Sequence, residues 1–300
     1  MMEYGSGLAL VKVPEAFLYE EDGTIADEVL SGWAVRLLEA RQDRNGRVPV
    51  ETYYGYRGWI DPGVLKPVTA RELIRRETSG DALVVRKRMA DLLAAPKVQG
   101  ALLATYSRGS ILEKTGEEKA GYLPVRAADG KTGYLAASSL MARRDSDGYF
   151  NQGGDDWFLH QKNLTAIPEE TLRKQVVEMA ESYLGVQYRW GGTSGAGIDC
   201  SGLVSMAYRL CGILIYRDAQ IRPEYPIHEI PWEDKKPGDL LFMKGHVAMY
   251  LGEGRYLHST GYARDFGCVY ASLVPGAPGY REDLDGKWEK AGSLYPLASK

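Results

Sequence analysis

The stretch that decides the fold runs from Tyr188 to Leu203 and reads Tyr-Arg-Trp-Gly-Gly-Thr-Ser-Gly-Ala-Gly-Ile-Asp-Cys-Ser-Gly-Leu. Five glycines lie within it, and Cys200 is followed by apolar residues at helical spacing up to Leu210. This spacing predicts that Cys200 lies in the first turn of a buried helix. The unpaired amides and the positive dipole end of such a helix favour thiolate over thiol. The glycines let a substrate approach the sulfur closely. The sequence therefore predicts a nucleophilic cysteine.

A nucleophilic cysteine needs a base, and the chain has four histidines: His160, His228, His246 and His258. The last two lie in short β-type runs joined around residues 252–254, which predict a hairpin. A three-residue loop pairs residues whose numbers have an even sum, so the last two histidines share a face, about 7–8 Å apart. A two-residue loop would place them on opposite faces. In the first arrangement one histidine acts as base and the other holds its tautomer.

The same residues admit other interpretations. A lone cysteine at a helix start is more often an inert small hydrophobe, and a histidine in an apolar strand is usually a core residue. The glycine-rich loop lacks both the Lys-Ser/Thr of a P-loop and the Gly-x-Gly-x-x-Gly spacing of a dinucleotide site. A zinc site built on Cys200, His246 and His258 would want a fourth ligand, and neither Cys211 nor Cys268 lies in a Cys-x-x-Cys pair. We therefore expect no metal and no other cofactor.

Five short motifs follow one another along the second half of the chain. They are Tyr188-Arg-Trp-Gly-Gly, Asp199-Cys-Ser-Gly-Leu, Pro237-Gly-Asp-Leu-Leu-Phe, Gly245-His-Val-Ala-Met-Tyr-Leu-Gly and Leu257-His-Ser. In these motifs and their order, the chain from about Leu172 to Leu297 resembles the NlpC (NlpC and p-sixty) family of bacterial cell-wall peptidases. The resemblance implies a circularly permuted relative of the papain-like fold.

The resemblance also assigns catalytic roles. By it Cys200 is the nucleophile, His246 the general base and His258 the orienting residue. Tyr188 is similar to the tyrosine that points its hydroxyl at the developing oxyanion, and the amide of Cys200 would be a second donor. Each donor of this kind is worth about 10²–10³ in rate.

Length, composition and charge limit the function further. A chain of 300 residues with 44% hydrophobic content has room for two or three domains with real cores. A net charge of −3 gives no reason to expect nucleic acid as a partner. No apolar run approaches the roughly 18–20 residues of a membrane helix, and no obligate protein partner is expected. Because residues 1–7 lack a basic region before an apolar stretch, we expect a cytoplasmic protein, or a periplasmic or secreted one if a signal peptide has been removed.

Residues 1 to about 143 contain an internal duplication. In each copy ten positions separate a Val/Leu-Pro-Val strand from a Gly-aromatic strand: Val48 to Gly58, and Leu123 to Gly133. Short alternating strands with Asn-Gly and Asp-Gly turns favour small β-barrels. The pattern resembles bacterial SH3-like domains.

These observations predict an α+β fold in which two small SH3-like β-barrels precede the papain-like, circularly permuted cysteine peptidase domain. The expected bounds are 1–70 for the first barrel, 80–143 for the second, 144–164 for a linker and 165–300 for the catalytic domain. The catalytic domain should begin with a helix after Pro168, with acidic residues in its first turn and an apolar stripe that ends at Gly185.

The first repeat holds a run of exposed-looking aromatic residues. Strand alternation would send Tyr54 and Tyr56 to one face and Tyr53 to the other, unless Gly55 interrupts the strand. These tyrosines either cover a small barrel or bind substrate. In the SH3-containing members of the family, the first barrel contributes a tyrosine and an acidic residue that hold the substrate's free α-amine. By that resemblance we assign Tyr56 and Glu28 to this role, with Tyr54 as the rival.

The family cleaves the bond between the γ-carboxyl of D-glutamate and lysine or meso-diaminopimelate in peptidoglycan stem peptides, and the SH3-linked members resemble dipeptidyl peptidases that need a free L-alanine. Muropeptides are therefore the expected partners. Asp199 and Ser201 would hold the γ-D-glutamyl part, although Asp199 also suits a helix N-cap. Asp218 matches the family's pattern, whereas Ala219 stands where the family often has serine. The alternatives are an amidase or acyltransferase on the same fold, and a wall-binding protein with a degenerate catalytic domain.

Overall fold

The computed structural model describes residues 7–38, 41–143 and 167–295. These residues form three antiparallel sheets and divide into two compact units. Unit 1 holds the described residues up to 143 together with Ser194–Ala196, and unit 2 holds the others. The predicted linker, 144–164, lies outside the described residues.

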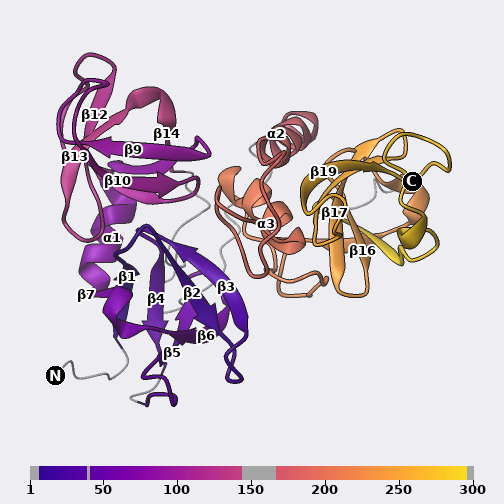
Figure 1. Ribbon diagram of the computed structural model, residues 1–300, viewed down its shortest axis with the longest axis horizontal. Coiled ribbons are helices and arrows are strands. Elements are labelled where there is room, and N and C mark those ends of the chain that lie inside the picture. The colour runs from indigo at the N-terminus through magenta and orange to yellow at the C-terminus, as the bar shows by residue number, and fades with distance from the viewer. Residues whose placement is uncertain (1–6, 39–40, 144–166, 296–300) are drawn as a thin grey trace. The chain divides into compact units, whose positions relative to one another are not determined.

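Unit 1 contains two seven-stranded sheets, coloured indigo to magenta in Figure 1. The first sheet has the order β3-β2-β6-β5-β4-β1-β7 and the second the order β10-β9-β13-β12-β11-β8-β14. The strands of the first are β1 (Leu8–Val11), β2 (Glu15–Tyr19), β3 (Ile25–Leu30), β4 (Ala34–Leu37), β5 (Val48–Thr52), β6 (Arg57–Ile60) and β7 (Leu65–Val68). Those of the second are β8 (Ala82–Val85), β9 (Met89–Leu93), β10 (Leu102–Ser107), β11 (Ile111–Lys114), β12 (Tyr122–Arg126), β13 (Thr132–Ala136) and β14 (Leu140–Ala142). Taken strand for strand, the two orders are the same.

The strand register repeats as well. Pro49 pairs with Trp59 in the first sheet, and Pro124 pairs with Tyr134 in the second. This agreement fits the internal duplication inferred from the ten-residue spacing. Helix α1 (Ala70–Thr78) follows the first sheet and precedes the second, and it begins at a capping box made by Thr69 and Glu72.

The two repeats contact each other at equivalent turns. Gly32, with φ of 81°, lies so close to the other repeat that a Cβ there would come 2.1 Å from the carbonyl oxygen of Ile111. The amide of Ile111 donates to the carbonyl of Ser31 at 2.8 Å, and the Trp33 indole donates to the carbonyl of Gly109 at 2.9 Å. A side chain at position 32 would separate these two turns, so glycine is required there.

The aromatic run in the first repeat is buried, which contradicts its exposed-looking pattern. Tyr53 and Tyr54 are each only 1% exposed, and with Trp33 they form three edge-to-face ring contacts with centroids 5.3–6.1 Å apart. The alternation prediction fails because β5 ends at Thr52. Gly55, with φ of 86°, turns the chain so that both tyrosines enter the same cluster.

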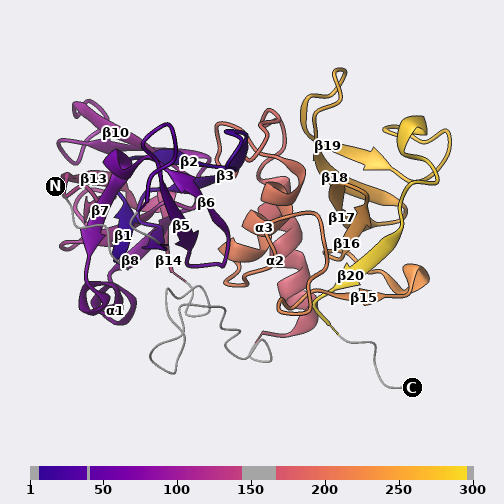
Figure 2. The same ribbon diagram turned by 90° about the horizontal axis from the view of Figure 1, so that it is seen from below.

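Unit 2 contains two helices, α2 (Glu169–Glu181) and α3 (Cys200–Leu210), and a six-stranded sheet of order β15-β20-β16-β17-β18-β19. Figure 2 shows α2 and α3 together on one side of this sheet, and α3 packs on β17 and β18. The strands are β15 (His228–Ile230), β16 (Leu240–Met243), β17 (His246–Gly252), β18 (Arg255–Thr260), β19 (Gly267–Ser272) and β20 (Lys290–Ser293). Short 3-10 helices lie at Pro62–Val64, Ala137–Ser139, Trp232–Asp234 and Glu282–Leu284.

Helix α2 confirms the helix predicted after Pro168. Leu172, Val176 and Ala180 form its buried stripe, and Gly185 follows with φ of 74°. None of the helices in the described part of the chain has the length and apolar character needed to cross a membrane.

Candidate active site

The first turn of α3 holds the predicted nucleophile. Cys200 is the first residue of the helix, and the carboxylate of Asp199 accepts a hydrogen bond from the amide of Gly202 as N-cap. All residues of α3 are buried, which confirms the prediction of a buried helix that starts at the cysteine. A Cβ on Gly202 would come 2.1 Å from the carbonyl oxygen of Gly192, so the glycine loop passes directly over the helix start.

This crossing gives a stability prediction. We expect Gly202→Ala to destabilise the protein by about 1–3 kcal/mol, because a backbone carbonyl rather than a flexible side chain occupies the space. Gly261→Ala is the matched control, since its Cβ would meet the Tyr188 ring at an ordinary 3.4 Å. Thermal unfolding of both variants measures the difference. Equal melting temperatures for the two would contradict the close approach at position 202.

The Cys200 thiol lies in a closed environment and is only 7% exposed. Its pKa is raised to about 12, mainly by burial and next by the Asp199 carboxylate, whereas the amides of Val247 and Ser201 and the guanidinium of Arg217 act in the opposite direction. The predicted preference for thiolate is therefore wrong for the free protein. The helix terminus does provide amides, but the cost of placing a charge in a buried site outweighs them.

The hairpin that carries the two histidines has the predicted parity. Met249 pairs with Leu257 and Tyr250 with Tyr256, so the numbers of paired residues have an even sum. The predicted three-residue loop is wrong in detail. Gly252 pairs with Arg255, which leaves a two-residue turn, and a β-bulge between positions 250 and 252 restores the even register.

This register brings His246 and His258 together. Nε2 of His246 lies 2.9 Å from Nδ1 of His258, and the two rings meet edge to face. His246 is the first residue of β17, and Val247 follows it. The amide of Val247 points at the Cys200 sulfur. The start of this strand therefore lies against Cys200, whereas the role of His246 as base stays a prediction.

Burial keeps both imidazoles neutral. It lowers the pKa of His246 to about 4 and that of His258 to about 3, and the charge of Arg281 acts in the same direction on both. A neutral His246 can accept a proton on Nδ1 only if its own hydrogen is on Nε2. His258 must then accept that hydrogen on Nδ1 and carry its own on Nε2, which is buried without a protein partner among the described residues.

Aromatic rings hold the histidine pair in place. Trp288 lies against His246 with centroids 5.9 Å apart, and Tyr256 meets both His258 and Trp288 edge to face at 5.1 and 5.2 Å. These contacts restrict rotation of the imidazoles, so the hydrogen bond between them keeps its direction.

Tyr188 lies in the same neighbourhood as the thiol. Its ring is half-buried and packs on Phe266 with centroids 6.1 Å apart. Burial raises the pKa of Tyr188, and the charges of Cys200 and Asp199 raise it further. The hydroxyl therefore remains protonated and can donate a hydrogen bond, as the predicted oxyanion role requires.

A buried polar network surrounds the helix start. Asp199 accepts hydrogen bonds from Arg217 at 3.1 and 3.0 Å, and Ser201 accepts one from the same guanidinium at 2.8 Å. The N-cap role that the sequence left open for Asp199 is thus observed, whereas substrate contact by Asp199 and Ser201 stays a prediction. Asp218 interacts with the hydroxyl of Tyr216. Sequence reasoning weighed Asp218 for this site and passed over Arg217, its neighbour, which reaches the network.

The candidate amine-binding residues lie in unit 1. Tyr54 donates its hydroxyl to the buried carboxylate of Asp27, and the buried carboxylate of Glu28 accepts the amide of Ser194 at 2.9 Å. Tyr56 is half-buried, and its amide donates to Thr52 at 3.0 Å. The partner of Tyr54 is thus Asp27, whereas the sequence-based assignment used the next residue, Glu28, as the acidic partner.

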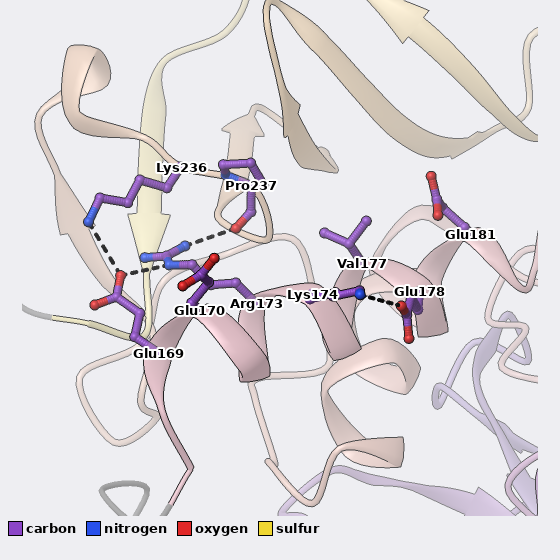
Figure 3. A pocket seen from close by; sticks show the side chains of 9 residues that line it. All are labelled: Glu169, Glu170, Arg173, Lys174, Val177, Glu178, Glu181, Lys236 and Pro237. Atoms are coloured by element: carbon purple, nitrogen blue, oxygen red, sulfur yellow. Dashed lines mark hydrogen bonds and ion pairs between the residues drawn. The ribbon is translucent and has the colours of Figure 1, made fainter.

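A hollow of about 680 Å³ lies elsewhere in unit 2, along α2 (Figure 3). Its charged lining is largely paired: Glu169 accepts from Arg173 at 2.7 Å and lies 3.4 Å from Lys236, and Lys174 lies 4.0 Å from Glu178. None of the predicted site residues lines it. This hollow is therefore not the site of the cysteine chemistry.

Comparisons with known proteins identify the family. Residues 185–270 match the model of the NlpC/P60 family. The chain is 34% identical to Dipeptidyl-peptidase 6 of Lysinibacillus sphaericus over 96% of this chain and 99% of that protein. It is 29% identical to a Gamma-D-glutamyl-L-lysine dipeptidyl-peptidase of Bacillus cereus over 77% of this chain and 63% of that protein. A crystal structure of an NlpC/P60 family protein from Bacillus cereus superposes with a TM-score of 0.71 and 20% identity, covering 96% of this chain and 100% of that one.

A buried cysteine at a helix start, with the strand that begins at His246 against its sulfur, is the arrangement expected of a cysteine hydrolase site. With a relative that matches along almost its whole length, the chain belongs to the NlpC/P60 family. The predicted family is thereby confirmed, and with it the NlpC/P60 fold.

Proposed function

We propose that this chain is a cysteine peptidase that cleaves the bond between the γ-carboxyl of D-glutamate and a diamino acid in peptidoglycan stem peptides. The observation that carries the proposal is the position of Cys200 at the start of α3, with the amide after His246 directed at its sulfur and His258 bonded to His246. The relatives named as dipeptidyl-peptidases support a hydrolase of this class. The diamino acid is lysine or meso-diaminopimelate, and the product is L-Ala-γ-D-Glu.

The reaction proceeds in two halves. The Cys200 sulfur attacks the γ-glutamyl carbonyl while its proton passes to Nδ1 of His246. The negative charge that develops on the reacting atoms and the positive charge on the imidazolium attract each other, which offsets part of the cost of forming charges in a buried site. The hydroxyl of Tyr188 and the amide of Cys200 donate to the oxyanion. His246 then protonates the leaving amine, and the C–N bond breaks. Water hydrolyses the thioester, which returns the thiol.

The requirement for a free L-alanine would come from unit 1. A buried carboxylate is compensated much better by an ammonium group than by a neutral amide N–H, and the attached muramic acid would add bulk, so L-alanine that is amide-linked to muramic acid would be rejected. Glu28 is buried, and Tyr54 already pairs with a second buried carboxylate, that of Asp27. We therefore keep Glu28 with Tyr56, or with Tyr54, as the residues that hold the amine.

The finer description of the fold belongs to the same proposal. We infer that the two seven-stranded sheets are SH3-like barrels, at 1–70 and 80–143, and that 165–300 is a circularly permuted papain-like domain; the repeated strand order supports the first point. A cytoplasmic location, where free stem peptides from wall turnover would be met, completes the proposal.

Two substrates test it directly. The protein is incubated with L-Ala-γ-D-Glu-diaminopimelate and with the same peptide amide-linked to N-acetylmuramic acid, and the products are identified by mass. We expect L-Ala-γ-D-Glu from the free tripeptide only, with inhibition by iodoacetamide and none by a chelator. Cleavage of the muramyl amide would favour an amidase, transfer of the acyl group to another amine an acyltransferase, and binding without turnover a wall-binding protein.

A further inference from the structure

Arg217 is a buried cation beside the nucleophile, and the reaction as proposed gives it no role. Its side chain is only 2% exposed. Nη1 donates to Oγ of Ser201 at 2.8 Å and to Oδ1 of Asp199 at 3.1 Å, whereas Nη2 donates to Oδ2 of Asp199 at 3.0 Å and to the carbonyl of Gly192 at 3.4 Å. One guanidinium therefore joins the residues on both sides of Cys200 to the glycine loop.

The bidentate geometry matters because the carboxylate of Asp199 is both a helix cap and a negative charge close to the thiol. It caps α3 through the amide of Gly202, and it lies next in sequence to the thiol. A buried carboxylate without a partner is costly, and it opposes formation of a negative charge on a neighbouring sulfur. The planar fork of an arginine satisfies both oxygens and cancels the charge, which a lysine ammonium does less completely.

We propose that Arg217 is a positioning residue that neutralises Asp199, so that the carboxylate can cap the helix without leaving an uncompensated negative charge beside the Cys200 sulfur. The proposal rests on the function proposed above only in taking Cys200 as the nucleophile. It concerns the reactivity of the thiol itself and needs no peptide substrate.

The other groups that face the thiol are also affected by this pair: Asp199 raises the pKa of Tyr188 and of His246, and Arg217 lowers that of Tyr188. Tyr188 stays protonated and carries no charge, and His246 on β17 is kept neutral by burial. Asp199 raises the pKa of the thiol and Arg217 lowers it. Replacing the guanidinium by a neutral group should therefore shift thiol ionisation in one direction, towards higher pH.

The test measures the rate at which iodoacetamide alkylates Cys200 as a function of pH, followed by mass of the Cys200 peptide so that Cys211 and Cys268 do not contribute. We expect Arg217→Gln to slow alkylation between pH 7 and 9 by roughly tenfold, equivalent to about one pKa unit. Asp199→Asn with Arg217→Gln should restore most of the rate, because the charge and its partner are removed together. Arg217→Lys should lie between wild type and Arg217→Gln.

The matched control is Arg173→Gln, which removes the partner of another buried carboxylate in unit 2, Asp239, at 2.7 Å. It should lower the melting temperature without moving the alkylation profile. If Arg217→Gln behaves in the same way, Arg217 is only structural and the proposal is overturned. If Arg217→Gln does not fold, two other variants test the proposal. Arg217→Lys should be alkylated more slowly than the wild type, and Asp199→Asn more rapidly. The proposal fails if the alkylation profile of either variant matches that of the wild type. Loss of peptidase activity with an unchanged profile would overturn this inference and leave the proposed reaction intact.

Discussion

Cys200→Ala should abolish release of L-Ala-γ-D-Glu from the free tripeptide, with a fall in rate of about 10⁴-fold or more, because covalent catalysis loses its nucleophile. The substitution removes one buried sulfur from the first turn of α3 and leaves the N-cap made by Asp199 in place. The fold should therefore persist. Product formation is followed by mass, and folding by circular dichroism and thermal unfolding.

The chain contains its own controls for this variant. Cys211, the C-cap of α3, and Cys268, in β19, are also buried free thiols. Cys211→Ala and Cys268→Ala should retain activity, with only the modest loss of stability that a small cavity causes. Turnover by Cys200→Ala comparable to that of these two variants would show that the nucleophile lies elsewhere.

The sequence predicted the helix at Cys200 and the histidine pair because both follow from local patterns. Apolar spacing after Cys200 places a helix start, and the parity of a hairpin depends only on the number of residues in its turn and bulge. The loop length itself was wrong, since a two-residue turn with one bulged residue gives the same parity as a three-residue loop. Sequence spacing cannot distinguish the two.

The predictions from sequence that were wrong concern properties set by burial in the folded protein. The expected thiolate was inferred from the helix terminus alone, whereas the pKa of Cys200 is set mainly by the packing that surrounds it. Tyr53 and Tyr54 read as surface residues because Gly55 was treated as an exception rather than as the end of the strand. Arg217 was missed because its partner Asp199 lies 18 positions away, and no motif spacing links an arginine after a helix to the N-cap before it.

Removal of the general base should reduce activity almost as much as removal of the nucleophile. His246→Ala should reduce kcat/KM by about 10²–10⁴-fold, since a positioned general base contributes that much and the buried thiol has no other imidazole on the strand beside it.

Substitution of His258 separates the orientation of the base from its acid–base chemistry. His258→Gln offers an amide oxygen that accepts the Nε2 hydrogen of His246, whereas His258→Leu leaves that hydrogen without an acceptor. His258→Gln should therefore retain far more activity than His258→Leu. Equal activity of these two variants would contradict the orienting role.

The pH profile gives an independent check on the same base. His246 acts when neutral, and burial lowers its pKa from 6.5 to about 4. Because the lowered pKa keeps His246 neutral in more acidic solution, the midpoint of the acidic limb of the kcat/KM profile should lie well below pH 6.5. Replacing Trp288, whose ring covers His246, by alanine would let water reach the imidazole and should move that limb upward, towards 6.5. An acidic limb at or above 6.5 in the unaltered protein would mean that a solvated group, not the buried His246, takes the proton from the sulfur.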